Sequence, residues 1–128
     1  MKLLLDTHVL IWSMEHPAKL SPAVIDAMQD HNNERFVSIA SVWEMSIKAR
    51  LGKLSLSHPF KSWATTAIES LTASLLPIAI EDAELQLQLP FEHRDPFDRM
   101  LVAQSLTRGM SIVSVDVVFD RYSVPRIW

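Results

Sequence analysis

The chain has 128 residues, enough for one domain, residues 1–128, with a sizeable hydrophobic core. Its hydrophobic fraction of 48% and charged fraction of 21% are typical of a globular protein, and no apolar run approaches the roughly 20 residues that cross a bilayer. The lack of cysteine excludes disulfides and thiolate metal sites and indicates a cytoplasmic protein; the net charge of −3 disfavours a broad basic surface for nucleic acid but is compatible with a nuclease.

The chain opens with a short apolar run that stops at a carboxylate. Leu3–Leu5 precede Asp6, and helical spacing of apolar residues begins after Thr7 and His8. This pattern predicts a strand buried on both faces, followed by a helix. Asp6 would then lie at the carboxyl end of the strand, where open α/β sheets bind ligands. A role as the N-cap of the following helix is an equally simple reading of Asp6.

The middle of the chain alternates between helical and extended patterns. His16–Lys19 is expected to form a loop. Ser21 and Pro22 after it fit the N-cap and first position of a second helix. Gly52 is placed to end a later helix. The alternating leucines of 85–89 fit a strand as well as a helix. Strands are expected at 35–39 and 75–78, and helices at 22–30, 40–50, 57–71 and 80–89.

The last third of the chain carries the clearest element boundaries. Asp95, Pro96 and Gly109 fit the N-cap, the first position and the C′ position of one helix. A strand is predicted at 111–115, ending at Asp116, and a short last strand at 124–128. Strands that alternate with helices predict an α/β fold in which a central parallel sheet is flanked by helices.

Four acids are expected at one edge of this sheet, because strand ends and the starts of the helices that follow them face the same way. They are Asp6, Glu44, Asp98 and Asp116. Two carboxylates about 4 Å apart repel each other by about 4 kcal/mol at an effective dielectric near 20, and a divalent cation removes that repulsion. Without cysteine, the suitable ions are Mg²⁺ or Mn²⁺.

Each acid also has a purely structural explanation. Glu44 can pair with Lys48 one helical turn later, Asp98 can stabilise a helix start together with Asp95, and Asp116 can begin a turn. None of the four is decisive alone. Their expected convergence favours a metal site over four unrelated roles.

Four stretches resemble, in order, those of a PIN domain, and more narrowly those of VapC-type toxins of type II toxin–antitoxin systems. They are Leu4–His8, Ser41–Lys48, His93–Gln104 and Ser114–Asp116. The resemblance covers nearly the whole chain. It implies a PIN-like three-layer fold, a metal-dependent endoribonuclease that hydrolyses RNA phosphodiester bonds, a VapB-type antitoxin as inhibitor, and a homodimer.

The resemblance also assigns roles to residues. It places the catalytic and metal-binding set, with Mg²⁺ or Mn²⁺ as cofactor, on Asp6, Glu44, Asp98 and Asp116. The hydroxyls of Thr7 and Ser114 are expected to support the acids, and Asp95 is expected to act first as a helix cap and second as a further supporting acid. His8 stands where many PIN domains carry a small polar residue, so a role at the start of the helix is favoured over acid–base chemistry.

Two sets of basic residues are candidates for contacts to RNA phosphates. Arg94 and Arg99 flank the Asp-Pro-Phe-Asp stretch and either contact phosphate or balance the local acids. Lys48, Arg50 and Lys53 form either a phosphate track or a solvated helix end.

Three other functions are alternatives to the toxin. A receiver-like regulatory binding module needs an Asp at the end of the second strand, where this chain has Ala40 and Ser41. A phosphohydrolase with an Asp-x-Asp motif needs an acid at the position of His8. A PIN nuclease that processes RNA without being a toxin is the alternative within the same family.

Overall fold

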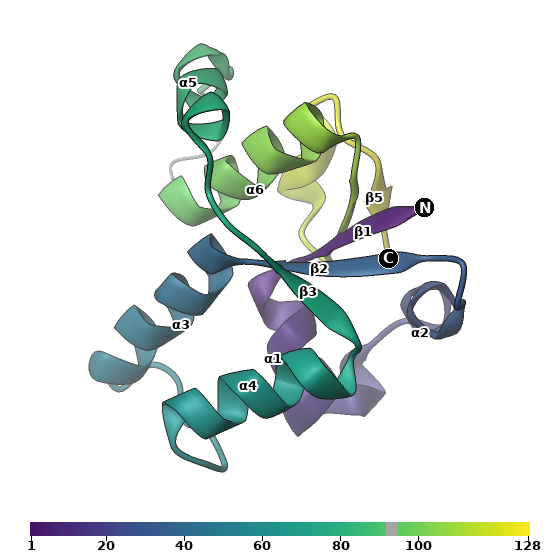
Figure 1. Ribbon diagram of the computed structural model, residues 1–128, viewed down its shortest axis with the longest axis vertical. Helices are drawn as coiled ribbons and strands as arrows, with labels where there is room; N and C mark the ends of the chain where they lie inside the picture. Colours follow the sequence, from purple (N-terminus) through teal and green to yellow (C-terminus); the bar gives the residue numbers. More distant parts are fainter. Residues whose placement is uncertain (92–94) are drawn as a thin grey trace.

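The computed structural model describes residues 1–91 and 95–128 and shows a five-stranded parallel sheet covered by helices (Figure 1). The strands, which lie in the order β3-β2-β1-β4-β5, are β1 (Lys2–Leu5), β2 (Glu34–Ser38), β3 (Ala73–Leu76), β4 (Ser111–Val113) and β5 (Arg126–Ile127). The helices in the described ranges are α1 (Thr7–Glu15), η1 (Pro17–Lys19), α2 (Pro22–Gln29), α3 (Ile39–Arg50), α4 (Phe60–Ser70), α5 (Ile80–Gln88), α6 (Pro96–Arg108) and η2 (Val117–Arg121), where η marks a 3₁₀ helix. The expected α/β fold with a parallel central sheet is confirmed.

Strand β1 is buried on both faces, as its apolar run predicts. Leu3 and Leu5 pack with residues of α1, α2, α3 and α4 in one core, whereas Leu4 packs with residues of α6 and η2 in a second core. All three leucines are fully buried. Alternate side chains of a strand point to opposite faces, so this short run joins the two cores. Asp6 follows directly and is held at the centre of the sheet edge.

Most predicted helix boundaries are confirmed by their caps. Ser21 accepts a hydrogen bond from the Val24 N–H at 3.2 Å, and Asp95 caps α6 as expected. Gly109 ends α6 with a φ of +63°, a left-handed conformation that glycine adopts without steric cost. Residues 80–88 form the helix α5, so the strand alternative for the alternating leucines is wrong.

Several predicted boundaries differ from the structure. The helix expected at 57–71 begins only at Phe60, and the strand expected at 124–128 covers Arg126–Ile127. The predicted loop at His16–Lys19 contains the 3₁₀ helix η1, and the third strand covers Ala73–Leu76 rather than 75–78. Strand β4 ends at Val113, two residues earlier than expected, because Ser114 and Asp116 turn the chain into η2. Across the described residues, no helix is both long enough and apolar enough to cross a bilayer.

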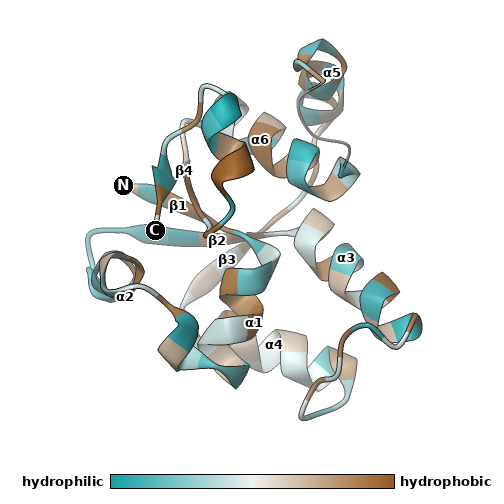
Figure 2. Ribbon diagram, turned by 180° about the vertical axis from the view of Figure 1, so that it is seen from behind, coloured by the Kyte–Doolittle hydropathy of each residue, from teal (hydrophilic) through white to brown (hydrophobic). Residues whose placement is uncertain are grey.

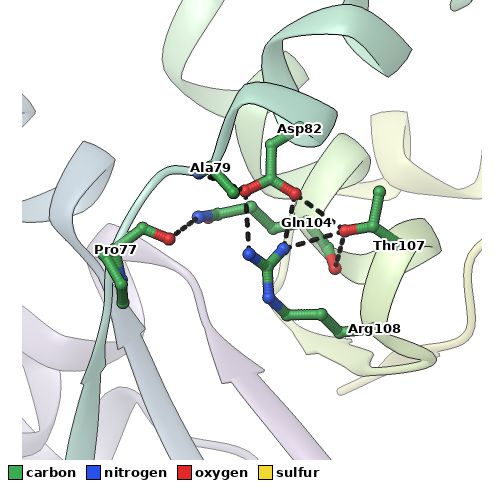
Figure 3. Close-up of polar contacts among 6 residues, drawn as sticks. All are labelled: Pro77, Ala79, Asp82, Gln104, Thr107 and Arg108. Carbon is green, nitrogen blue, oxygen red and sulfur yellow. Dashed lines mark hydrogen bonds and ion pairs between the residues drawn. The ribbon is translucent and has the colours of Figure 1, made fainter.

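Helix α5 lies at the periphery and is fastened to α6 (Figures 1 and 2). The buried Asp82 of α5 accepts hydrogen bonds from the Ala79 N–H at 2.8 Å, from Thr107 Oγ1 at 2.8 Å and from Arg108 Nη2 at 3.0 Å (Figure 3). Burial raises the pKa of Asp82, but these three hydrogen bonds and the positive charge of Arg108 outweigh it and lower the pKa below its ordinary value. Asp82 thus binds both the start of its own helix and the end of α6.

Candidate functional site

Asp6 occupies the carboxyl end of the central strand and caps the first helix. Its backbone N–H continues the β1–β4 ladder by donating to the Val113 carbonyl at 3.0 Å. Its Oδ1 accepts a hydrogen bond from the Thr7 N–H at 2.7 Å, and the side chain is only 4% exposed. The cap role is therefore present, and it leaves the second carboxylate oxygen, Oδ2, for other contacts.

Ser114 connects Asp6 to Asp116. Its hydroxyl, fully buried after β4, donates to Asp6 Oδ2 at 2.7 Å and accepts from the Asp116 N–H at 3.0 Å. Asp116 caps η2, with its Oδ1 accepting from the Val118 N–H at 3.0 Å. One serine hydroxyl therefore fixes one acid by its side chain and the other by its backbone.

Thr7 connects the same strand end to Glu44 in α3. Thr7 Oγ1 donates to Glu44 Oε1 at 2.7 Å, and Lys48 Nζ lies 2.6 Å from Glu44 Oε2. Glu44 is 4% exposed, so the pair with Lys48 is not an ordinary surface pair of the kind that contributes about 0.3–0.5 kcal/mol. Both oxygens of Glu44 are held by neighbouring side chains.

The electrostatic surroundings of Asp6 confirm that Glu44 is near. Burial raises the pKa of Asp6; the hydrogen bonds from Ser114 and Thr7 and the positive charge of His8 offset this in part, and the negative charge of Glu44 adds to the rise. Two carboxylates thus interact in a poorly hydrated region. A cation bound beside them would favour the charged form of Asp6.

Lys48 brings the start of α6 into the same electrostatic group. Asp95 caps this helix by accepting from the Phe97 N–H at 2.8 Å and from the Asp98 N–H at 3.3 Å. Burial lowers the pKa of Lys48, but its hydrogen bond to Glu44 and the charges of Glu44, Asp95 and Asp98 raise it overall. The lysine is therefore a positive charge shared by the acids of α3 and α6.

Hydrogen bonds connect three of the four acids in a line rather than in a closed cluster. In the described part of the chain, no three histidine, aspartate or glutamate side chains are close enough together to hold a metal ion. Ser114 joins Asp116 to Asp6, and Thr7 joins Asp6 to Glu44. Asp98 is related to this line through its charge, which acts on Lys48. The donors present are carboxylate and hydroxyl oxygens, which match the preference of Mg²⁺ and Mn²⁺.

The two arginines proposed as phosphate contacts have different outcomes. Arg99 is buried, and its guanidinium makes four hydrogen bonds, to Gln86 Oε1 and to the carbonyls of Gln86, Leu89 and Pro90. These bonds anchor the end of α5, so Arg99 has a structural role, and its contact to phosphate stays a prediction. Arg94 lies outside the described residues.

Two residues near the site have roles that the sequence did not reveal. Arg126 in β5 donates to the Ser114 carbonyl at 3.1 Å and pairs with Asp120, so it supports the turn that carries Asp116. Lys48 pairs with a buried acid and lies near the charges of Asp95 and Asp98. The i, i+4 spacing revealed the pair, but the burial of Glu44 and the proximity of α6 required the structure.

Comparisons with known proteins agree with this architecture. Residues 3–125 match the PIN domain family. The chain is 30% identical over 125 residues to Ribonuclease VapC22 of Mycobacterium tuberculosis (strain ATCC 25618 / H37Rv), which covers 96% of this chain and 93% of that protein.

Two solved structures share the fold. One is VapBC2 from Rickettsia felis bound to a DNA fragment from its promoter, with a TM-score of 0.76, 11% identity, and coverage of 98% of this chain and 97% of that one. The other is VapBC-1 from nontypeable Haemophilus influenzae, with a TM-score of 0.61, 17% identity, and coverage of 98% and 96%.

Proposed function

The chain belongs to the PIN domain family, and we propose that it is a metal-dependent endoribonuclease that acts in the cytoplasm as the toxin of a type II toxin–antitoxin pair. The observation that carries the proposal is the buried network of Asp6, Ser114, Thr7 and Glu44 at the carboxyl end of the central strand. Burying two acids beside each other destabilises a fold unless a cation compensates for them. The relative with 30% identity is named a ribonuclease, which supports the proposed reaction.

In this proposal, Asp6, Asp98 and Asp116 hold Mg²⁺, with Mn²⁺ as a substitute, directly or through water. A bound Mg²⁺ would supply charge stabilisation at the phosphodiester and lower the pKa of a bound water. Glu44 would orient or deprotonate the attacking water. The donor set fits this ion because it consists of carboxylate and hydroxyl oxygens.

The protein's own contribution is to hold these acids in fixed positions. Thr7 Oγ1 and Lys48 Nζ each hold one oxygen of Glu44, at 2.7 and 2.6 Å. The Thr7 N–H and Ser114 Oγ hold the two oxygens of Asp6, both at 2.7 Å. Groups fixed in this way need little reorganisation when charge develops in the transition state.

We also propose a VapB-type antitoxin as inhibitor and a homodimer as the assembled form. The structural relatives are solved as VapBC complexes, which supports a protein antitoxin. Trp43 is 60% exposed and packs edge-on against Phe97, and Ile80, Leu87 and Phe91 are exposed as well. Exposed apolar side chains around α3 and α5 favour contact with another protein chain. Size-exclusion chromatography with light scattering tests the homodimer.

The direct test is cleavage of total cellular RNA by the purified protein with Mg²⁺, compared with Asp6→Ala and Asp116→Asn. We expect cleavage by the wild type and its loss in both variants. Equal cleavage by all three proteins would overturn the assigned site. Growth arrest on expression, relieved by a small adjacent gene, separates a toxin from an RNA-processing nuclease, and a lack of cleavage by the wild type would favour a non-catalytic binding module.

A further inference from the structure

A hollow of about 480 Å³ opens next to the acids, and its charged lining residues are mainly of the opposite charge. Residues of α1, η1 and the end of α3 line it, and its lysines are Lys19, Lys48 and Lys53. Glu15 is the one acid among the lining residues of this hollow. The whole chain has a net charge of −3, so three lysines around one hollow are a local reversal of the overall balance. We call this hollow the lysine cleft.

Lys48 links the lysine cleft to the acids. Its Nζ lies 2.6 Å from Glu44 Oε2, and the same side chain lines the cleft. About a third of the side chain, 35%, is exposed, so it is open to a ligand as well as paired. A ligand in the cleft would therefore lie directly beside the carboxylates proposed to act in catalysis.

The end of α3 places Lys53 at the same cleft. Gly52 has a φ of +73°, its N–H donates to the Ala49 carbonyl at 3.2 Å, and the Lys53 N–H donates to the Lys48 carbonyl at 2.8 Å. These two bonds form a Schellman motif, in which a left-handed residue reverses the chain at the end of a helix. The reversal holds the backbone of Lys53 against that of Lys48, so the two lysines line the cleft from one rigid turn.

Trp12 holds Lys19 at the same cleft. Lys19 Nζ lies 5.3 Å from the centroid of the Trp12 ring, within the range of a cation–π contact. The ring is itself fixed, because Trp128 packs edge-on against it with the centroids 5.9 Å apart. Trp12 therefore positions a lysine, a better-supported role than stacking on an RNA base.

Glu15 lines the cleft but is already engaged by residues at and before the start of α4. Its Oε1 accepts hydrogen bonds from the Ser57 N–H at 3.1 Å, from Ser57 Oγ at 2.9 Å and from Trp63 Nε1 at 2.7 Å. These contacts direct the carboxylate toward the start of α4. The three lysines therefore share the hollow with one acid, Glu15, whose Oε1 already accepts hydrogen bonds from Ser57 and Trp63.

We propose that the lysine cleft binds the sugar–phosphate backbone of single-stranded RNA next to the bond that is cut, with Lys19 and Lys53 contacting phosphates and Lys48 lying between the cleft and the acids. This inference rests on the proposed ribonuclease function and adds the form of its substrate. Phosphate oxygens are the partners that clustered lysines favour, and such contacts depend little on base sequence. A hollow of this size has room for a nucleotide or two of a single strand.

The test is fluorescence anisotropy with a labelled single-stranded RNA of 12 nucleotides, in EDTA so that binding is measured without cleavage. The proteins are wild type, Lys19→Gln, Lys53→Gln, the double variant, and Lys61→Gln as a control. Lys61 is an exposed lysine of α4 that does not line the cleft. Thermal melts establish that every variant is folded.

We expect each cleft variant to weaken binding by roughly three- to tenfold and to reduce the salt slope by about 0.7, the value for one phosphate contact to a single strand. The Lys61 variant should bind like the wild type, and a duplex of the same length should bind more weakly than the single strand. Equal binding of the RNA by all proteins would overturn the proposal.

Cleavage in Mg²⁺ separates this inference from the proposed function. If the wild type cleaves RNA and both cleft variants cleave at the same rate, the lysine cleft is not the substrate track and the ribonuclease stands. If the wild type does not cleave RNA but the cleft variants lose RNA binding, the cleft is an RNA site and the ribonuclease proposal falls.

Discussion

Ser114 Oγ donates a hydrogen bond of 2.7 Å to Asp6 Oδ2, joining two residues that are 108 positions apart in the chain. The contact follows from strand order, because β1 and β4 are neighbours in the sheet and Asp6 and Ser114 directly follow them. The same hydroxyl accepts the Asp116 N–H. A single small side chain therefore sets the spacing of two acids proposed to hold the metal.

Replacing this hydroxyl should impair both the site and the fold. In Ser114→Ala, Asp6 Oδ2 loses a donor and the Asp116 N–H loses its acceptor, in a position that water does not reach. We expect RNA cleavage to fall by about 10- to 100-fold, as when a partner of a metal ligand is lost. The free energy of unfolding should fall by about 1–3 kcal/mol. Cleavage rates and urea unfolding measure the two effects, with Ser62→Ala, on the exposed face of α4, as the control.

The ionised carboxylate of Asp6 should destabilise the metal-free protein at neutral pH. Its pKa is raised in the folded state, mainly by burial, so the folded form binds a proton more readily than the unfolded form does. Stability should then decrease as the pH rises from the ordinary aspartate pKa, near 4, through the raised value. We expect Asp6→Asn to raise the melting temperature at pH 7 in EDTA by a few °C, about 1 kcal/mol, while abolishing cleavage.

The pH dependence provides the decisive comparison for Asp6. The gain in melting temperature from Asp6→Asn should vanish below about pH 4, where the wild-type carboxyl is protonated in both states. A stability difference between Asp6→Asn and the wild type that does not change with pH would contradict the raised pKa. Asp26→Asn, at an exposed position of α2, should show neither effect.

A bound metal ion should offset the destabilisation caused by the ionised Asp6. Binding to the folded state alone stabilises a protein, by about 2.7 kcal/mol when the ligand is at 100 times its Kd. We expect millimolar Mg²⁺ or Mn²⁺ to raise the melting temperature of the wild type by several °C and to leave Asp6→Ala and Asp116→Asn nearly unchanged. No shift in the wild type with either ion would count against a metal site at these acids.

Much of this arrangement could be predicted from local sequence, and its limits are physical. Leu3–Leu5 indicated the central strand, and the Asp95–Pro96 and Gly109 signals set the ends of α6, because caps and buried runs depend on near neighbours. The acids were placed at one sheet edge from the alternation of strands and helices. That Lys48 lies among them could not be predicted, since the distance between α3 and α6 depends on tertiary packing.

The role of Arg99 shows the same limit. An arginine next to Asp98 in the chain suggested either a phosphate contact or a charge partner. The structure turns it toward the carbonyl groups at the end of α5, and sequence spacing contains no information about that contact. The helix α5 was itself ambiguous, because its alternating leucines fit two periodicities and its exposed position places few constraints on them.

Lys48 should be needed for stability in the absence of metal. Replacement by Met removes the partner of the buried Glu44 and a positive charge that acts on Asp95 and Asp98. We expect Lys48→Met to lower the free energy of unfolding in EDTA by about 2–3 kcal/mol, the cost of leaving a buried charge unpaired, and Mg²⁺ to restore more stability to the variant than to the wild type. Urea unfolding with and without Mg²⁺ measures this, with Lys61→Met as control. Equal stabilisation of both proteins by Mg²⁺ would show that Lys48 does not share the acids with the metal.

The contact between Asp82 and Arg108 should make the α5–α6 pair sensitive to acid. The pKa of Asp82 is lowered in the folded state, because its hydrogen bonds outweigh the effect of burial. The stabilisation is therefore complete above the ordinary aspartate pKa and is lost as the pH falls through the lowered value. Asp82→Asn should reduce the free energy of unfolding by about 3 kcal/mol at pH 7, since Arg108 loses its charged partner at a fully buried position. Urea unfolding at pH 7 and near pH 3 should show that the stability difference between Asp82→Asn and the wild type becomes smaller in acid. Asp26→Asn should be as stable as the wild type at both pH values. A difference for Asp82→Asn that stays constant across this range would mean that packing, rather than the charge of Asp82, fastens α5 to α6.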